Sequence, residues 1–290
     1  MHANMYTGYY IMKAMLEVNC TDLEWLYSPD WEYYDYGNCK RHLQMLLPFK
    51  CEWKQDEKFP IILMIPGSAW HKQELYNDIP KFTKLAERGF AIAVLEYRES
   101  DIAKFPAQIE DVSNALEFID TKAEQFHFDM SRIFIMGNSS GGHVAMMSVL
   151  FNAHGLCKPL PNIRGVISVS GSTDILICAK EPLPSWMKVR PSTVLLGVDQ
   201  IEGNEEIAEK ASCAIYITED VNRLPPVLLF HSDNDSVVSV ENSRLLYNKL
   251  NNTNHEVYYY ELEGNDAHCG VTFFDSKILN IIQEFCDKQK

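Results

Sequence analysis

The feature that most constrains the fold of this chain is a regular alternation of apolar runs with helical patterns. Six short runs carry apolar residues at nearly every position, at residues 59–66, 90–97, 132–137, 163–170, 226–231 and 256–262. Such runs suit strands that are buried on both faces, as in a parallel sheet. Segments with helical spacing lie between the runs and after the last one, at residues 74–88, 107–126, 238–251 and 271–287. This order predicts an α/β fold, with a mostly parallel, doubly wound central sheet and helices on both faces.

Two regions depart from this alternation. Residues 1–58 are rich in aromatic side chains, and we expect a short helix and a leading antiparallel hairpin there. Residues 174–212 contain three prolines and an acidic stretch, and they are too long for a simple connection between strands. We expect them to form a small insertion, or cap, over the functional site. Because no repeat or linker marks a boundary, we expect residues 1–290 to form a single domain.

Charge and cysteine usage narrow the function classes. The net charge is −14, from 40 acidic and 26 basic residues, which argues against nucleic acid or an anionic membrane as partner. Residues 1–22 lack the basic start, apolar core and cleavage site of a signal peptide. The eight cysteines show no CxxC pair and no Cys/His spacing for zinc. We therefore expect a cytoplasmic protein with free thiols and no metal site.

The strongest chemical signal is a serine between two glycines. Residues 137–141 read Gly-Asn-Ser-Ser-Gly, directly after the apolar residues 133–136 and before the helical stretch 142–147. This pattern at a strand-to-helix turn is typical of a nucleophile elbow. The turn strains the serine backbone and leaves no room for side chains at the flanking glycines. We therefore predict Ser139 as a nucleophile, with the free N–H groups of the next helix pointing at the reaction site.

A serine nucleophile needs a base to take its proton and an acid to orient that base. In this type of fold the chain order is serine, acid, histidine, with the acid and the histidine in loops after two later strands. Asp235 follows the fifth apolar run and His268 follows the sixth, so they are the predicted acid and base. Asp233 is the rival acid, with an Asx turn as its other role. We expect His231 and His143 to be structural.

The reaction also needs backbone N–H donors for the negative charge that develops on the substrate oxygen. One donor is expected from Ser140, the residue after the nucleophile. The others are expected from Ser68 and Ala69, in the loop after the first apolar run, where small residues let the amides approach the substrate. The alternative for that loop is an ordinary strand-ending turn.

These motifs together resemble the α/β-hydrolase superfamily. Within it the chain is similar to small serine esterases related to bacterial acetyl-xylan and feruloyl esterases (BD-FAE-like) and to hormone-sensitive-lipase-like carboxylesterases. The resemblance runs from about residue 36 onward. It is most specific at Tyr97-Arg98 with the following residues 105–112, and at residues 130–143 around the elbow. It implies an α/β-hydrolase fold and an esterase activity.

The resemblance also places Asp235 and His268 where the family has its acid and base. The chain departs from the family pattern at residues 66–70, which read Pro-Gly-Ser-Ala-Trp where a histidine and three glycines usually precede the tryptophan. Asn138 stands where relatives often carry an acidic residue, and Ser232 replaces a usual glycine. None of these changes removes a predicted catalytic group.

The resulting hypothesis is a serine carboxylic-ester hydrolase that works through an acyl-enzyme, without metal or organic cofactor. The expected substrate is a small-molecule or carbohydrate ester; the lack of a large lid favours short acyl chains, with acetyl groups on sugars as a candidate. One alternative is a formamidase-like or oligopeptidase-like amide hydrolase with the same triad. Another is a non-catalytic binding protein on a hydrolase fold. Three aromatic residues are candidate pocket walls, or else core or loop packing: Trp70, Tyr97 and Trp186.

Overall fold

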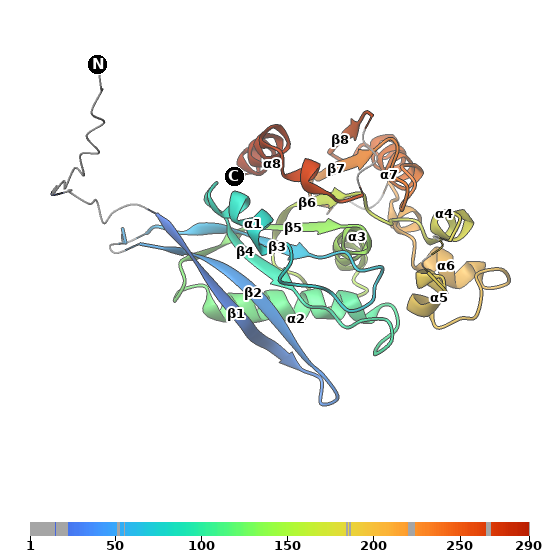
Figure 1. Ribbon diagram of the computed structural model, residues 1–290, viewed down its shortest axis with the longest axis horizontal. Helices are drawn as coiled ribbons and strands as arrows, with labels where there is room; N and C mark the ends of the chain where they lie inside the picture. Colours follow the sequence, from blue (N-terminus) through green and yellow to red (C-terminus); the bar gives the residue numbers. More distant parts are fainter. Residues whose placement is uncertain are drawn as a thin grey trace, which may run out of the picture.

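The computed structural model is built around one eight-stranded sheet (Figure 1). It describes residues 15, 23–50, 53–54, 56–183, 185, 187–219, 224–264 and 268–289. The strands are β1 (Glu24–Asp35), β2 (Lys40–Phe49), β3 (Phe59–Ile65), β4 (Ala91–Leu95), β5 (Phe128–Asn138), β6 (Ile163–Val169), β7 (Val227–Ser232) and β8 (Val257–Leu262). Their order in the sheet is β1-β2-β4-β3-β5-β6-β7-β8, parallel from β4 to β8 and antiparallel at β1 and β2. Each of the six apolar runs therefore contains a strand, and the predicted mostly parallel sheet is confirmed.

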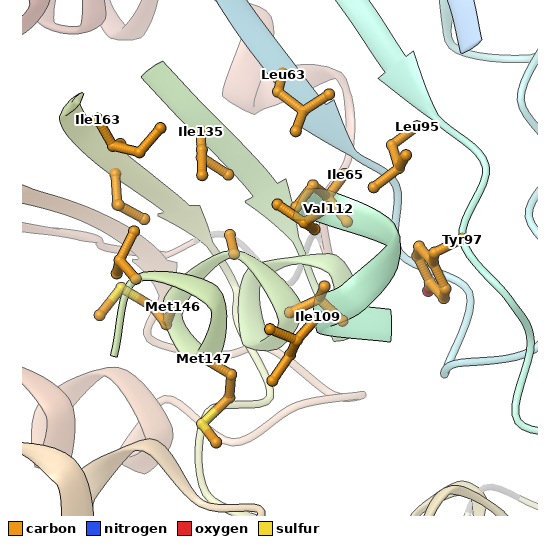
Figure 2. Packing of buried hydrophobic residues seen from close by; sticks show 14 of the residues in the cluster. Leu63, Ile65, Leu95, Tyr97, Ile109, Val112, Ile135, Met146, Met147 and Ile163 are labelled. Carbon is orange, nitrogen blue, oxygen red and sulfur yellow. The ribbon is translucent and has the colours of Figure 1, made fainter. Parts of the chain in front are cut away.

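Helices cover both faces of the sheet, because the apolar residues of each central strand alternate between them. The helices outside the insertion are α1 (Ile79–Ala86), α2 (Ala107–Lys122), α3 (Ser140–Ala153), α7 (Glu241–Asn252) and α8 (Ser276–Lys288). In β3, Leu63 and Ile65 share a core with residues of α2 and α3 (Figure 2). Ile62 and Met64 share a second core with residues of α1 and α8. The prediction of helices on both faces is confirmed.

The two antiparallel strands form the expected leading hairpin. They pair from Glu24 with Phe49 to Asp35 with Lys40. Trp31 of β1 packs edge-on against Phe118 of α2, with ring centroids 6.2 Å apart. This contact holds the hairpin against the helix that precedes the elbow strand. The predicted short helix falls partly on residues 1–14 and 16–22, outside the described residues, and the described part of residues 1–58 contains none.

The motif formed by Tyr97-Arg98 and residues 105–112 joins the end of β4 to α2. The Arg98 backbone N–H and Nε donate to the buried Asp111 carboxylate at 2.6 and 2.7 Å. The Tyr36 hydroxyl donates to the same carboxylate at 2.5 Å, and the Arg98 guanidinium lies 3.7 Å from the Tyr36 ring centre. A buried carboxylate needs such partners because burial of an unpaired charge is costly. The motif therefore has a structural role in this fold.

The insertion between β6 and β7 consists of short helices. These are α4 (Ile175–Lys180), α5 (Pro191–Leu196), α6 (Glu205–Lys210) and the 3-10 helix η1 (Cys213–Tyr216). They lie together at one end of the molecule, beside α3 and α7 (Figure 1). This position puts the insertion near the carboxyl ends of the strands, where open α/β sheets bind ligands.

Within the described residues, no helix combines the length and the apolar character needed to cross a bilayer.

Candidate active site

Ser139 lies at a sharp turn between β5 and α3. Its backbone has φ +52° and ψ −125°, a conformation that a residue with a side chain rarely adopts. A Cβ on Gly137 would overlap the carbonyl of Gly141, and a Cβ on Gly141 would overlap the carbonyl of Ile65. The two flanking glycines are therefore required by close backbone approaches, as the elbow pattern predicts.

The structure brings the predicted nucleophile, base and acid together. His268 Nε2 lies 2.9 Å from Ser139 Oγ, and His268 Nδ1 lies 2.8 Å from Asp235 Oδ2. Asp235 comes from the loop after β7, and His268 from the loop after β8. With a proton on Nδ1, His268 donates to Asp235 and leaves Nε2 to accept the Ser139 hydroxyl proton. This is the geometry that general-base activation of a serine requires.

The Asp235 carboxylate is fully buried and held from several sides. Its Oδ1 accepts the backbone N–H groups of Val237 and Val238, both at 2.9 Å. Burial alone would raise the pKa of Asp235, but the hydrogen bonds from His231 and His268 and the backbone N–H groups outweigh it. The pKa of Asp235 is therefore held well below its usual value, and the group is ionised at neutral pH.

His231 lies directly behind this acid. Its Nε2 is 2.9 Å from the Val238 carbonyl and 3.5 Å from Asp235 Oδ2, and its Nδ1 is 2.7 Å from Ser243 Oγ. The sequence predicted a structural residue, and the structure adds that it positions the acid loop. The signal available in the sequence was its place at the end of a buried strand, four residues before Asp235.

The rival acid has a different partner. Asp233 Oδ1 accepts the backbone N–H of Gly264 at 3.0 Å, and this bond ties the loop after β7 to the loop after β8. The carboxylate that reaches His268 belongs to Asp235. Of the two candidates, the geometry therefore favours Asp235 as the partner of the base.

The electrostatics of His268 follow from the same contacts. Burial of the ring lowers the pKa of His268, whereas the hydrogen bond with Asp235 and the neighbouring Cys269 raise it more strongly. The net direction is upward, because the nearby carboxylate stabilises the imidazolium. His268 therefore gains a proton more readily than an isolated histidine.

The loop of residues 66–70 after β3, where the sequence predicts oxyanion donors (the predicted oxyanion loop), is held by hydrogen bonds that the sequence did not predict. The Gly67 N–H donates to Asn138 Oδ1 at 3.0 Å, and the Ser68 N–H donates to Ser140 Oγ at 2.9 Å. Ala69 then adopts φ +52°. Among the described residues, the N–H groups of Ala69 and Ser140 have no acceptor. We therefore correct one expectation: Ala69 and Ser140 present free N–H donors, whereas the Ser68 N–H is already engaged.

Tyr97 does not line a pocket. Its side chain is fully buried at the end of β4, in the core shown in Figure 2. The hydroxyl lies 2.9 Å from Ser68 Oγ and 3.3 Å from Ser140 Oγ. The expectation of a substrate contact is therefore corrected: Tyr97 supports the oxyanion loop from behind.

Trp70 does line the cavity in front of Ser139. Its indole N–H donates to His143 Nδ1 at 3.1 Å, and His143 Nε2 lies 2.7 Å from the Ala211 carbonyl. Burial lowers the pKa of His143 to about 4, so the ring is neutral and donates from Nε2. His143 thus links Trp70 to the end of the insertion. Trp186, the third aromatic candidate, lies outside the described residues.

The cavity has an empty volume of about 540 Å³, including its open mouth. Ala69, Trp70 and Ser139 line it from the sheet side. The insertion contributes a further set of lining residues: Cys178, Glu181, Leu183, Met187, Arg190 and Ser192.

Comparisons with known proteins relate this chain to esterases. The BD-FAE family model matches residues 47–250. Esterase LipC of Mycobacterium tuberculosis is 24% identical over 213 residues, covering 71% of this chain and 52% of LipC. Isoprenylcysteine alpha-carbonyl methylesterase ICME of Arabidopsis thaliana is 25% identical over 227 residues, covering 74% of this chain and 51% of ICME. The chain thus spans about half the length of these curated relatives.

A solved structure, a truncated form of a carbohydrate esterase from gut microbiota, superposes with a TM-score of 0.72 at 23% identity. The superposition covers 91% of this chain and 96% of that one. At this level of identity the likeness concerns the fold alone, and it shows the α/β-hydrolase fold that the sequence predicts.

Proposed function

The chain belongs to the BD-FAE family, and from this membership we propose that it is a serine carboxylesterase with Ser139, His268 and Asp235 as its catalytic triad. The observation that carries the proposal is the continuous chain of hydrogen bonds from Ser139 Oγ through both ring nitrogens of His268 to Asp235. The strained elbow and the free N–H groups of Ala69 and Ser140 support the same proposal.

In the first half of the proposed reaction, Ser139 Oγ attacks the ester carbonyl carbon while His268 Nε2 takes the hydroxyl proton. Asp235 stays ionised and stabilises the imidazolium through Nδ1. The N–H groups of Ala69 and Ser140 stabilise the negative charge on the substrate oxygen. When the tetrahedral intermediate collapses, His268 gives its proton to the leaving alkoxide, and the acyl group stays on Ser139.

In the second half, a water molecule takes the place of the departed alcohol. His268 Nε2 accepts a proton from this water as its oxygen attacks the acyl carbon. Collapse of the second tetrahedral intermediate returns the proton to Ser139 Oγ and releases the carboxylic acid. The same base and the same N–H donors therefore serve both steps.

For the substrate, we propose a short-acyl ester, with acetylated carbohydrate as the class. The lining of the cavity supports a short acyl chain, because residues of the insertion line it opposite Ser139. The carbohydrate part of the proposal draws support from the structure with the similar fold that is named a carbohydrate esterase from gut microbiota.

Hydrolysis of p-nitrophenyl acetate tests the proposed activity. The wild type should hydrolyse it, and Ser139→Ala should reduce kcat to near the background rate, because it removes the hydroxyl that lies 2.9 Å from His268 Nε2. A fluorophosphonate probe should label the wild type at Ser139 and leave the variant unlabelled. A wild type that is silent on a broad panel of esters and unlabelled would contradict the proposal. Faster cleavage of a matched anilide would redirect it to an amide hydrolase.

We also propose a cytoplasmic location, without nucleic acid or membrane as partner. The described cysteines are all free thiols, which suits a reducing compartment. The net charge of −14 supports the absence of an anionic partner. Cell fractionation with an antibody against the chain tests the location.

A further inference from the structure

A carboxylate that the triad does not use lines the Ser139 cavity. Glu181 directly follows α4, and its side chain is partly buried. Its Oε1 accepts the backbone N–H of Ser239 at 2.8 Å. The other oxygen, Oε2, has no hydrogen-bond partner in the described part of the chain. Glu181 thus keeps one acceptor atom available for a ligand.

The fold on balance disfavours the charged form of Glu181. Burial raises the pKa of Glu181 most, and the negative charge of Asp235 raises it further; the bond from Ser239 and the positive charges of His231 and Arg190 lower it, but the net direction is upward. A glutamine would accept the same N–H from Ser239 without repelling Asp235. A ligand hydroxyl that donates to Oε2 would account for a carboxylate here, because hydrogen bonds to charged acceptors are the stronger ones.

Arg190 places donors at the same cavity. Its Nη1 donates to the Cys178 carbonyl at 2.8 Å, and its Nη2 donates to the Glu181 carbonyl at 3.0 Å. These two bonds fix the guanidinium against the end of α4 and use only two of its five N–H groups. The side chain is therefore preorganised, with donors to spare, next to the residue that supplies the free acceptor.

Ser192 gives an independent indication of polar recognition. The residue lines the cavity and is 2% exposed. Its hydroxyl is buried and has no hydrogen-bond partner in the described structure. Because a buried hydroxyl without a partner destabilises the fold, a polar ligand that completes it is the simplest account of its retention.

We propose that Glu181 and Arg190 are specificity-determining residues that bind hydroxyl groups of the ester substrate. A hydroxyl donates one hydrogen bond and accepts others, so neighbouring hydroxyls on a substrate match a fixed carboxylate beside a fixed guanidinium. The inference rests on the proposed function and deepens it. The hydroxyls can belong to a sugar alcohol or to a hydroxylated acyl group, and the two sources are separated by substrate pairs.

The test compares Glu181→Gln with the wild type on two pairs of esters. The first pair is a mono-O-acetylated methyl xyloside and the same acetate with its free hydroxyls methylated. The second pair is ethyl lactate, whose short acyl group carries a hydroxyl, and its O-methylated analogue. Glu181→Gln keeps the acceptor for Ser239, so folding is preserved. For one pair, we expect the ratio of kcat/KM for the hydroxylated ester to kcat/KM for its methylated analogue to fall about tenfold or more. The change should come chiefly from a higher KM for the hydroxylated ester. The pair that responds identifies the source of the hydroxyl.

Two controls sharpen this test. Glu202→Gln removes an exposed carboxylate of the same insertion that does not line the Ser139 cavity, and it should leave both ratios unchanged. Ser192→Ala should lower the same ratio as Glu181→Gln without lowering the melting temperature, because the hydroxyl makes no bond inside the protein.

The outcomes separate this inference from the proposed function. A wild type that is active on p-nitrophenyl acetate, with a Glu181→Gln variant that shows unchanged ratios, overturns the subsite alone. Equal losses on both members of each pair, with a shifted pH profile, show that Glu181 acts through Asp235 and overturn it as well. A wild type without esterase activity or fluorophosphonate labelling overturns both proposals.

Discussion

The two sides of Ser139 are built from different chemistry. On the side of the predicted acid, the contacts involve ionisable groups. From the cavity to the interior, His268 contacts Asp235, and Asp235 contacts His231. On the oxyanion side, the contacts are neutral: the Gly67 and Ser68 amides are held by Asn138 and by the Ser140 hydroxyl. The acid side therefore controls the protonation of His268, whereas the oxyanion side controls the position of the backbone N–H groups in the loop after β3.

The difference predicts different kinds of failure. Loss of a charged group on the acid side removes the driving force for proton transfer, and its effect depends on pH. Loss of a neutral contact on the oxyanion side lets the loop shift, which weakens transition-state binding at every pH. Substitutions on the two sides can therefore be distinguished by their pH dependence as well as by their magnitude.

The largest expected effect is on the acid side. Asp235→Asn should lower kcat for p-nitrophenyl acetate about 10⁴-fold, because the amide favours the wrong tautomer of His268 and removes the charge that stabilises its imidazolium. The matched control is Asp233→Asn, which removes the charge of the rival acid but keeps an oxygen that can accept the Gly264 N–H; it should retain kcat within about tenfold. A greater loss in Asp233→Asn than in Asp235→Asn would reverse the assignment of the acid.

On the oxyanion side we expect a smaller loss. Asn138→Ala removes the acceptor of the Gly67 N–H and should lower kcat up to about a hundredfold, with no change in the pH profile. Asn138→Asp keeps an acceptor at the same place and should stay much closer to the wild type. If Asn138→Ala and Asn138→Asp lose activity equally, the bond to Gly67 does not hold the loop.

The same two sides differ in how far the sequence predicted them. Asp235 and His268 were found because buried strands have continuous apolar runs, and because the loops after those strands must meet at one edge of a parallel sheet. The direction of a backbone N–H carries no such signal. It depends on local dihedral angles, here positive φ at Ala69 and Trp70, and on the Ser140 hydroxyl that engages Ser68.

Aromatic residues were the least predictable part of the site. An aromatic side chain near the active-site motifs suits a pocket wall and a core position equally well. Trp70 lies at the cavity because the left-handed turn at Ala69 carries it there, whereas Tyr97, two residues after β4, is buried with its hydroxyl against Ser68 of the same loop. The sequence did not predict Glu181 as a site residue, because its hydrogen bond with Ser239 joins residues 58 positions apart in the sequence.

The pH dependence of kcat/KM tests the electrostatics of the acid side. In the proposed mechanism the neutral ring of His268 is the base, and the net effect of its surroundings is to raise the pKa of His268 above 6.5. The rate constant kcat/KM should therefore rise with pH, with the midpoint of its acid limb above pH 6.5. Fluorophosphonate labelling of Ser139 should follow the same limb, since it uses the same base. A midpoint at or below 6.5 in both measurements contradicts the electrostatic account of the acid side.

The smallest expected effect comes from Tyr97, whose hydroxyl lies behind the oxyanion loop. Tyr97→Phe removes the contacts to Ser68 Oγ and Ser140 Oγ but keeps the ring in the core. We expect a few-fold loss of kcat, an unchanged KM, and a loss of about 1 kcal/mol in the free energy of unfolding, measured by urea titration. Trp70→Phe is the matched comparison, since Trp70 does line the cavity, and it should change KM. A change of KM in Tyr97→Phe would instead mean that the hydroxyl reaches the substrate, and the division between a supporting layer and a cavity wall would have to be redrawn.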